Sequence, residues 1–168
     1  MSSGDASRTL VIGVGNAYRS DDGVGPSIAR EVRRKALRGV DVREESGEGA
    51  ALLEAWRNAE RVILIDAVSS GGAPGTIYRF EIPEETMPAQ FFNYSTHAFS
   101  VAEAVELGRA LDLLPAHLTV FGIEGEHFAS GEGLSAGVGR AAEEVVRQIL
   151  ERLAAEESLP TISELDDA

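Results

Sequence analysis

The glycine-rich stretch Gly13–Gly25, which reads GVGNAYRSDDGVG, most constrains what this chain can fold into. It follows a short apolar run that predicts a strand over Arg8–Val14, apolar on both faces as in a parallel sheet covered by helices. A helical pattern follows the stretch. In open α/β sheets, ligands bind beyond the carboxyl ends of the strands. A loop there with adjacent acids, Asp21 and Asp22, therefore indicates a functional site.

Strands and helices alternate along the rest of the chain. Further strands are predicted at 40–44, 61–68, 76–82 and 118–125, and helices at 24–37 (ended by Gly39), 50–58, 95 or 100–113, and 136–153. Strand 76–82 follows its predecessor too soon for a helical crossover, which favours antiparallel pairing at a sheet edge. The pattern predicts an α/β fold, a three-layer α/β/α sandwich with a mostly parallel, twisted five-stranded sheet. One domain is expected at 8–154, with flexible tails at 1–7 and 155–168.

The composition limits the partners. The chain of 168 residues has 28 acidic and 15 basic residues, a net charge of −13, which argues against nucleic acid or an anionic membrane surface and permits a cationic partner or a metal. Without cysteine there are no disulfides, thiol nucleophiles or thiolate metal sites. No apolar run is long enough to span a membrane and no signal core opens the chain, so a cytoplasmic location is expected.

One dense basic patch stands out in this acidic chain. It falls on the first predicted helix and comprises Arg30, Arg33, Arg34, Lys35 and Arg38. A solvent-exposed helix face is the simpler interpretation, and docking of a partner is the alternative.

Three residues far apart in the sequence are candidates for chemistry: Asp22, Asp66 and His97. Asp66 ends an apolar run, so it should lie at the carboxyl end of a strand. His97 lies at a helix entrance, where the helix dipole disfavours imidazolium and leaves the neutral ring that a metal ligand needs. Two carboxylates and an imidazole suit nickel, zinc or manganese, with positions left for another ligand. Each residue also has a purely structural alternative. Asp22 would cap the helix that follows it, Asp66 would accept hydrogen bonds from loop amides, and His97 would be a helix-start residue whose ring has its hydrogen bonds satisfied.

Other chemistries fit the loop less well. A dinucleotide fingerprint needs a third glycine where Tyr18 stands, and the chain contains neither a P-loop Gly-Lys-Ser/Thr nor a Gly-x-Ser-x-Gly elbow. His117 precedes the last predicted strand and is expected to be exposed. His127 lies in a loop next to Glu124 and Glu126, where a role as a ligand is not favoured.

Four short motifs between about Arg8 and Leu153 occur together at a characteristic spacing. They are Gly13-Val14-Gly15-Asn16 with Asp21-Asp22-Gly23-Val24-Gly25, Ile65-Asp66-Ala67, Ala73-Pro74-Gly75-Thr76, and Ser95-Thr96-His97. On these motifs the sequence resembles the hydrogenase maturation endopeptidases, which process nickel–iron hydrogenases. It departs from some members at Ser46-Gly47-Glu48-Gly49, where they have Gly-Gly-Thr, and this loop is one place where substrate selectivity can differ.

The resemblance implies an endopeptidase that removes a C-terminal extension from the hydrogenase large-subunit precursor once nickel has been inserted. It implies that Asp22, Asp66 and His97 contact that nickel, which the substrate supplies, and that no organic cofactor is needed. Asp22 or His97 would take the proton of the attacking water. Two other hypotheses stay open: a non-enzymatic, metal-sensing assembly factor or chaperone for the large subunit that uses the same residues, and a nucleotide- or phosphate-binding protein, against which the paired acids count.

Overall fold

The structure is a computed structural model that describes residues 9–91 and 101–157. Five strands form one sheet in the order β2-β1-β3-β5-β4. The strands are β1 (Thr9–Val14), β2 (Val40–Glu45), β3 (Arg61–Val68), β4 (Ile77–Ile82) and β5 (His117–Glu124). The helices are α1 (Val24–Arg34), α2 (Gly49–Trp56), α3 (Val101–Ala110) and α4 (Ala136–Glu157), with short 3-10 turns η1 (Ser20–Gly23) and η2 (Ala89–Phe91).

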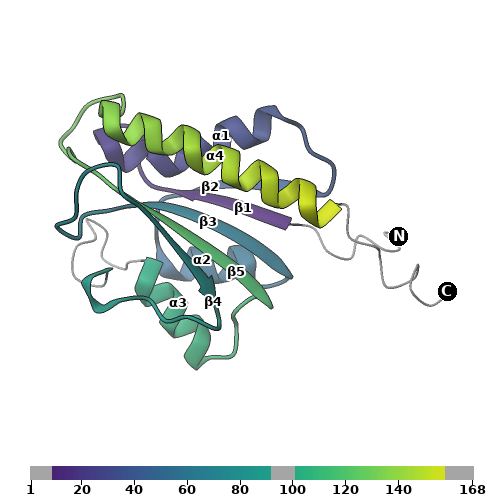
Figure 1. The fold of residues 1–168 in the computed structure, drawn as a ribbon. Coiled ribbons are helices and arrows are strands. Elements are labelled where there is room, and N and C mark those ends of the chain that lie inside the picture. The colour runs from purple at the N-terminus through teal and green to yellow at the C-terminus, as the bar shows by residue number, and fades with distance from the viewer. Residues whose placement is uncertain (1–8, 92–100, 158–168) are drawn as a thin grey trace, which may run out of the picture.

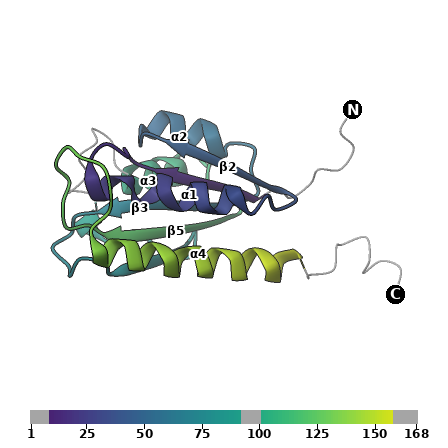
Figure 2. The same cartoon turned by 90° about the horizontal axis from the view of Figure 1, so that it is seen from above.

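The sheet is the middle of three layers. Helices α1 and α4 cover one face, and α2 and α3 cover the other (Figures 1 and 2). Each face has its own apolar core: Ile28, Val145 and Ile149 pack with the first, and Leu52, Trp56 and Val105 with the second. The predicted α/β/α sandwich is confirmed.

Strand β3 shows how the sequence distributes side chains between the two cores. Ile63 and Ile65 belong to the core under α1 and α4, whereas Val62 and Leu64 belong to the core under α2 and α3. Successive side chains of a strand point to opposite faces. Asp66 therefore points to the α2 and α3 face, at the end of the strand.

The edge strand β4 pairs antiparallel with β5, and the other pairings are parallel. The connection between β3 and β4 spans residues 69–76 and contains no helix, so it can only return the chain in the opposite direction. The predicted antiparallel edge strand is confirmed. It could be predicted because the length of a connection limits which strand pairings are possible.

Some predicted boundaries are wrong. Helix α1 ends at Arg34 rather than at residue 37, because Ala36 adopts a positive φ of 48°, and Gly39 lies beyond the helix end. Helix α4 continues to Glu157, past the helix end predicted at 153. The alternative starts of α3 at residues 95 and 100 lie outside the described residues, as do the tails at 1–7 and 158–168.

The basic patch on α1 is largely used within the protein. Arg30 and Arg33 both form ion pairs with Glu44 of β2, at 2.8 and 3.0 Å, and Arg34 pairs with Glu31 at 2.6 Å. These ion pairs favour the interpretation of the patch as a solvent-exposed helix face, and they join α1 to the edge strand β2.

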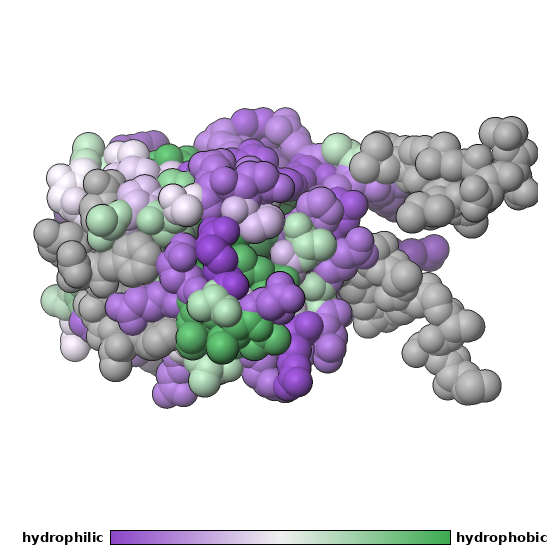
Figure 3. Space-filling view, turned by 90° about the horizontal axis from the view of Figure 1, so that it is seen from below, coloured by the Kyte–Doolittle hydropathy of each residue, from purple (hydrophilic) through white to green (hydrophobic). Residues whose placement is uncertain are grey.

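The α3 side of the molecule combines polar and apolar surface. Seen from this side, apolar side chains gather in one central area bordered by hydrophilic ones (Figure 3). Apart from Tyr18, the exposed large apolar residues within 9–91 and 101–157 are Leu107, Leu111 and Leu113. None of the helices in these ranges is both long and apolar enough to cross a bilayer.

Candidate active site

The candidate site lies where the chain changes direction in the sheet. From β1 the chain passes through α1 to β2 on one side, and later returns to place β3 on the other side of β1. The carboxyl ends of β1 and β3 adjoin at this switch point, which is where open α/β sheets bind ligands. Asp22 follows β1, and Asp66 lies two residues before the end of β3, so the fold brings these two predicted residues to the same edge of the sheet.

Glycines let the loop after β1 lie directly on the strand ends. A Cβ at Gly25 would come 2.6 Å from the carbonyl oxygen of Ile65 and would also collide with that of Val14. Gly15 has a positive φ of 142°, and a Cβ there would collide with the backbone of Asp22. The start of α1 is thus in contact with the residue just before Asp66, which holds Asp22 and Asp66 near one another.

Asp22 is a buried carboxylate at this edge, with 3% of its surface exposed. Its Oδ2 accepts a hydrogen bond from the backbone amide of Asn16 at 3.0 Å, which closes the glycine-rich loop on itself. The N-cap residue of α1 is Gly23. Asp22 therefore does not occupy the N-cap position of the helix that follows it.

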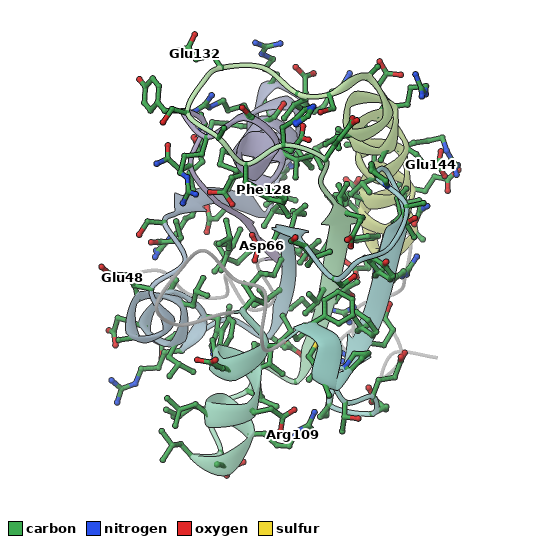
Figure 4. All side chains as sticks on the ribbon, turned by 90° about the vertical axis from the view of Figure 1, so that its left-hand side faces the viewer. Glu48, Asp66, Arg109, Phe128, Glu132 and Glu144 are labelled. Carbon is green, nitrogen blue, oxygen red and sulfur yellow. The ribbon has the colours of Figure 1, made fainter. Side chains whose placement is uncertain are left out.

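Asp66 is also mostly buried, with 9% of its surface exposed. It lies near the middle of the carboxyl edge, below Phe128 and Glu132 of the loop that follows β5 (Figure 4). In the sheet, its register partner on β5 is Gly122, which has no side chain to cover it. Asp66 also lines a pocket with the neighbouring residues Ala67 and Val68.

The third predicted residue, His97, lies outside the described residues. The residues on either side of the stretch 92–100, Phe91 and Val101, both line the pocket beside Asp66. Within residues 9–91 and 101–157, no three His, Asp or Glu side chains are grouped so as to hold a metal ion. Any metal held here by three ligands of this chain needs a residue from outside those ranges.

Asp21, next to Asp22, performs a different task that was not predicted. It is fully buried, and its Oδ2 accepts hydrogen bonds from the amides of Glu126 and His127, at 2.8 and 2.9 Å. The Ser135 amide donates to Oδ1 and the Ser135 hydroxyl to Oδ2, both at 2.7 Å. Burial raises the pKa of Asp21, but these hydrogen bonds together lower it further, so the pKa lies below its ordinary value of 3.8. Asp21 thus fastens the loop 125–135 beside the site.

A second buried carboxylate, Glu124, fastens the loop on the other side. Its Oε1 accepts hydrogen bonds from the amides of Ser70 and Gly72 at 2.8 and 3.1 Å, and its Oε2 accepts one from the Ser70 hydroxyl at 2.7 Å. Glu124 follows the apolar run of β5 as Asp66 follows the apolar run of β3, so the signal that singled out Asp66 was present for Glu124 too. These bonds hold the turn that follows Asp66.

The remaining histidines stand apart from the two aspartates. His117 is exposed at the start of β5, at the opposite end of the strand, as predicted. The side chain of His127 is 68% exposed, and its backbone amide is what binds Asp21. Its exposure gives no support to a ligand role.

The fold and site define an α/β protein with carboxylates at the switch point of its sheet, and comparisons with known proteins narrow the class. The HycI family, described as hydrogenase maturation protease, matches residues 26–152. The chain is 30% identical over 150 residues to the hydrogenase 2 maturation protease of Escherichia coli, which covers 87% of this chain and 90% of that one.

Solved structures agree with the sequence comparison. The hydrogenase maturating endopeptidase HybD from E. coli superposes with a TM-score of 0.73 at 26% identity, over 89% of this chain and 93% of that one. A [NiFe] hydrogenase maturation protease HybD from Thermococcus kodakarensis gives 0.64 at 26% identity, over 88% and 99%. The chain belongs to the hydrogenase maturation protease family. It is a peptidase with the fold of that family.

Proposed function

We propose that this endopeptidase removes the C-terminal extension of a nickel–iron hydrogenase large-subunit precursor after nickel has been inserted. We further propose that Asp22, Asp66 and His97 recognise the nickel that the precursor carries. Action in the cytoplasm, expected from the sequence, belongs to the same proposal. The relatives named above support the substrate class.

The observation that carries the proposal is the convergence of Asp22 and Asp66 at the switch point. Both are mostly buried carboxylates, Asp22 in the turn η1 that follows β1 and Asp66 near the end of the adjoining strand β3, and carboxylate oxygens with an imidazole are suitable nickel ligands. The stretch that contains His97 begins and ends beside the pocket that Asp66 lines. An incomplete ligand set of this kind would hold a metal weakly alone and more firmly when the precursor supplies further ligands.

The chemistry that these residues would perform is hydrolysis of one peptide bond. Nickel near the scissile carbonyl or the attacking water would act as a Lewis acid. Asp22 or His97 would accept the proton of that water as its oxygen bonds to the carbonyl carbon. The C–N bond then breaks, and the leaving amine takes up the proton.

The test is the mass of a large-subunit precursor before and after incubation with this protein, in a nickel-loaded and a nickel-free sample. We expect the loss of a C-terminal peptide from the nickel-loaded sample alone. Loss of the peptide from both samples would refute nickel recognition but would still demonstrate peptidase activity. If a precursor from the same organism stayed intact in both samples, a metal-sensing assembly factor for the large subunit would become the better account.

A further inference from the structure

The proposal above assigns no ligand to the pocket beside Asp66, whose chemistry differs from that of the carboxylates. Apolar side chains form most of its wall, among them Val68, Phe80, Met87, Phe91, Val101 and Val120. The space inside it that a water-sized group can occupy is about 30 Å³. This is room for about two water molecules, so the pocket suits a small side chain and not a large cofactor.

A missing side chain creates part of this space. Gly122 of β5 lies in register between Asp66 of β3 and Tyr78 of β4. Val120, two positions earlier in β5, belongs to the core under α2 and α3, so a side chain at position 122 would point to that face too. A glycine inside a strand often marks a place where another group approaches closely.

The walls of the pocket are rigid. The ring of Phe91 packs edge-on against Tyr78 and Phe80, with centroid distances of 5.1 and 5.4 Å. The Glu124 carboxylate fixes Ser70, which also lines the pocket, through the hydrogen bonds described above. The cavity is therefore preformed, and binding there needs little ordering of the protein.

We propose that this pocket is the subsite for an apolar side chain of the precursor next to the scissile bond. This inference rests on the proposed function, because it takes Asp66 as part of the reacting centre. Asp66 lines the pocket, so a side chain seated in it lies beside that carboxylate and brings the adjoining peptide bond near it. The apolar wall disfavours a charged side chain, and the Asp66 carboxylate in that wall disfavours an anionic one in particular.

The first experiment reshapes the pocket. A Cβ in Gly122→Ala would lie 3.3 Å from Val68 Cγ1 and 3.7 Å from Phe91, so the variant should fold after a small adjustment while filling part of the space. Val101→Ala enlarges the pocket instead. Gly139→Ala is the matched control, because a Cβ there meets nothing within 4 Å.

The readout is kcat/KM for two precursors, once the cleaved bond has been located by mass: the natural one, and one whose apolar residue beside that bond is replaced by Ala. We expect Gly122→Ala to shift the preference about tenfold toward the Ala precursor, since one methylene in an apolar pocket is worth roughly that factor or more. Val101→Ala should shift it the other way, and Gly139→Ala should leave it unchanged. An unchanged preference in both pocket variants would overturn the subsite.

A second readout does not depend on cleavage. The chain has two methionines, Met1 and Met87, and Met87 lines the pocket. With ¹³C-methyl methionine, a peptide spanning the cleaved bond (or, if no cleavage occurs, the C-terminal residues of the precursor) should shift the Met87 signal and leave that of Met1 in place. A peptide with Asp instead of the apolar residue should not shift it.

The two readouts separate the possible failures. If no precursor is cleaved but Met87 responds to the peptide, the proposed function fails while the pocket remains an apolar binding site. If cleavage occurs but Met87 does not move and the preference is unchanged, the precursor side chain does not enter the pocket and the subsite is wrong.

Discussion

Asp21 and Asp22 are adjacent and both buried, yet the structure gives them different surroundings. Asp21 receives four hydrogen bonds from residues 126, 127 and 135, more than a hundred positions further along the chain. Asp22 accepts a hydrogen bond from the backbone amide of Asn16 within its own loop and lies in the turn η1, beside the carboxyl ends of β1 and β3. Burial alone therefore does not identify a reactive carboxylate. What distinguishes Asp21 is that the partners described for it come from a loop far along the chain.

The largest effect should come from Asp22→Asn, which removes the charge and keeps the shape. We expect processing of the nickel-loaded precursor to fall by about a thousandfold, within the range for loss of an acid–base group. The melting temperature should change little. Mass spectrometry of the precursor over time gives the rate. Asp112→Asn is the matched control, since Asp112 is exposed and its positive φ of 56° suits Asn.

Asp21→Asn tests the structural role of Asp21, and this change should lower the free energy of unfolding. The Asn side chain has one acceptor oxygen, and its NH₂ group would face backbone N–H groups that are themselves donors. We expect a loss of about 3 kcal/mol, as for buried donors left without a charged acceptor. For a domain of this size the melting temperature should fall by roughly 6–12 °C. Calorimetry measures it, and an unchanged value would show that Asp21 does not fasten the loop.

The pH dependence of stability should sharpen the same distinction. The folded-state pKa of Asp21 is lowered below 3.8, so its contribution is present above that pH and is lost as the pH falls through the folded-state pKa. We expect the difference in unfolding free energy between the wild type and Asp21→Asn to be constant above about pH 5 and to shrink at lower pH. Denaturant titrations from pH 7 to pH 3 test this. A difference that grows on acidification would contradict it.

The smallest effect should come from Ser135→Ala. This change removes the hydroxyl that donates to Asp21 Oδ2 at 2.7 Å but keeps the amide that donates to Oδ1. A loss of about 1 kcal/mol is expected for one such hydrogen bond. Ser130→Ala, at an exposed position of the same loop, serves as control. Equal effects of the two changes would mean that the hydroxyl contributes nothing specific.

Much of the fold was predictable because local patterns determine it. The apolar run of β3 predicted its ends correctly, and the short connection after it predicted the antiparallel edge. The end of α1 was not predictable in this way. Ala36, rather than a glycine, takes the positive φ that follows the helix, and alanine gives no sequence signal for that conformation.

The site was predictable only in part. Asp66 could be found because a carboxylate at the end of a buried strand has a definite position in an α/β sheet. The sequence does not reveal which of Asp21 and Asp22 turns toward the loop 125–135, because that depends on contacts with residues far along the chain. Glu124 gave the same local signal as Asp66, yet its hydrogen bonds to Ser70 and Gly72 give it a supporting role.

The hydrogen bonds of Asp21 also bear on the order in which the protein assembles. They join residues separated by 105 to 114 positions in the chain. Contacts between such distant residues close large loops and form slowly compared with local ones. During synthesis, Asp21 cannot meet its partners until β5 and the loop after it have left the ribosome. We therefore expect the loop 125–135 to dock late on this edge of the sheet. A partly made chain then exposes Asp22 and Asp66 without the loop that borders them.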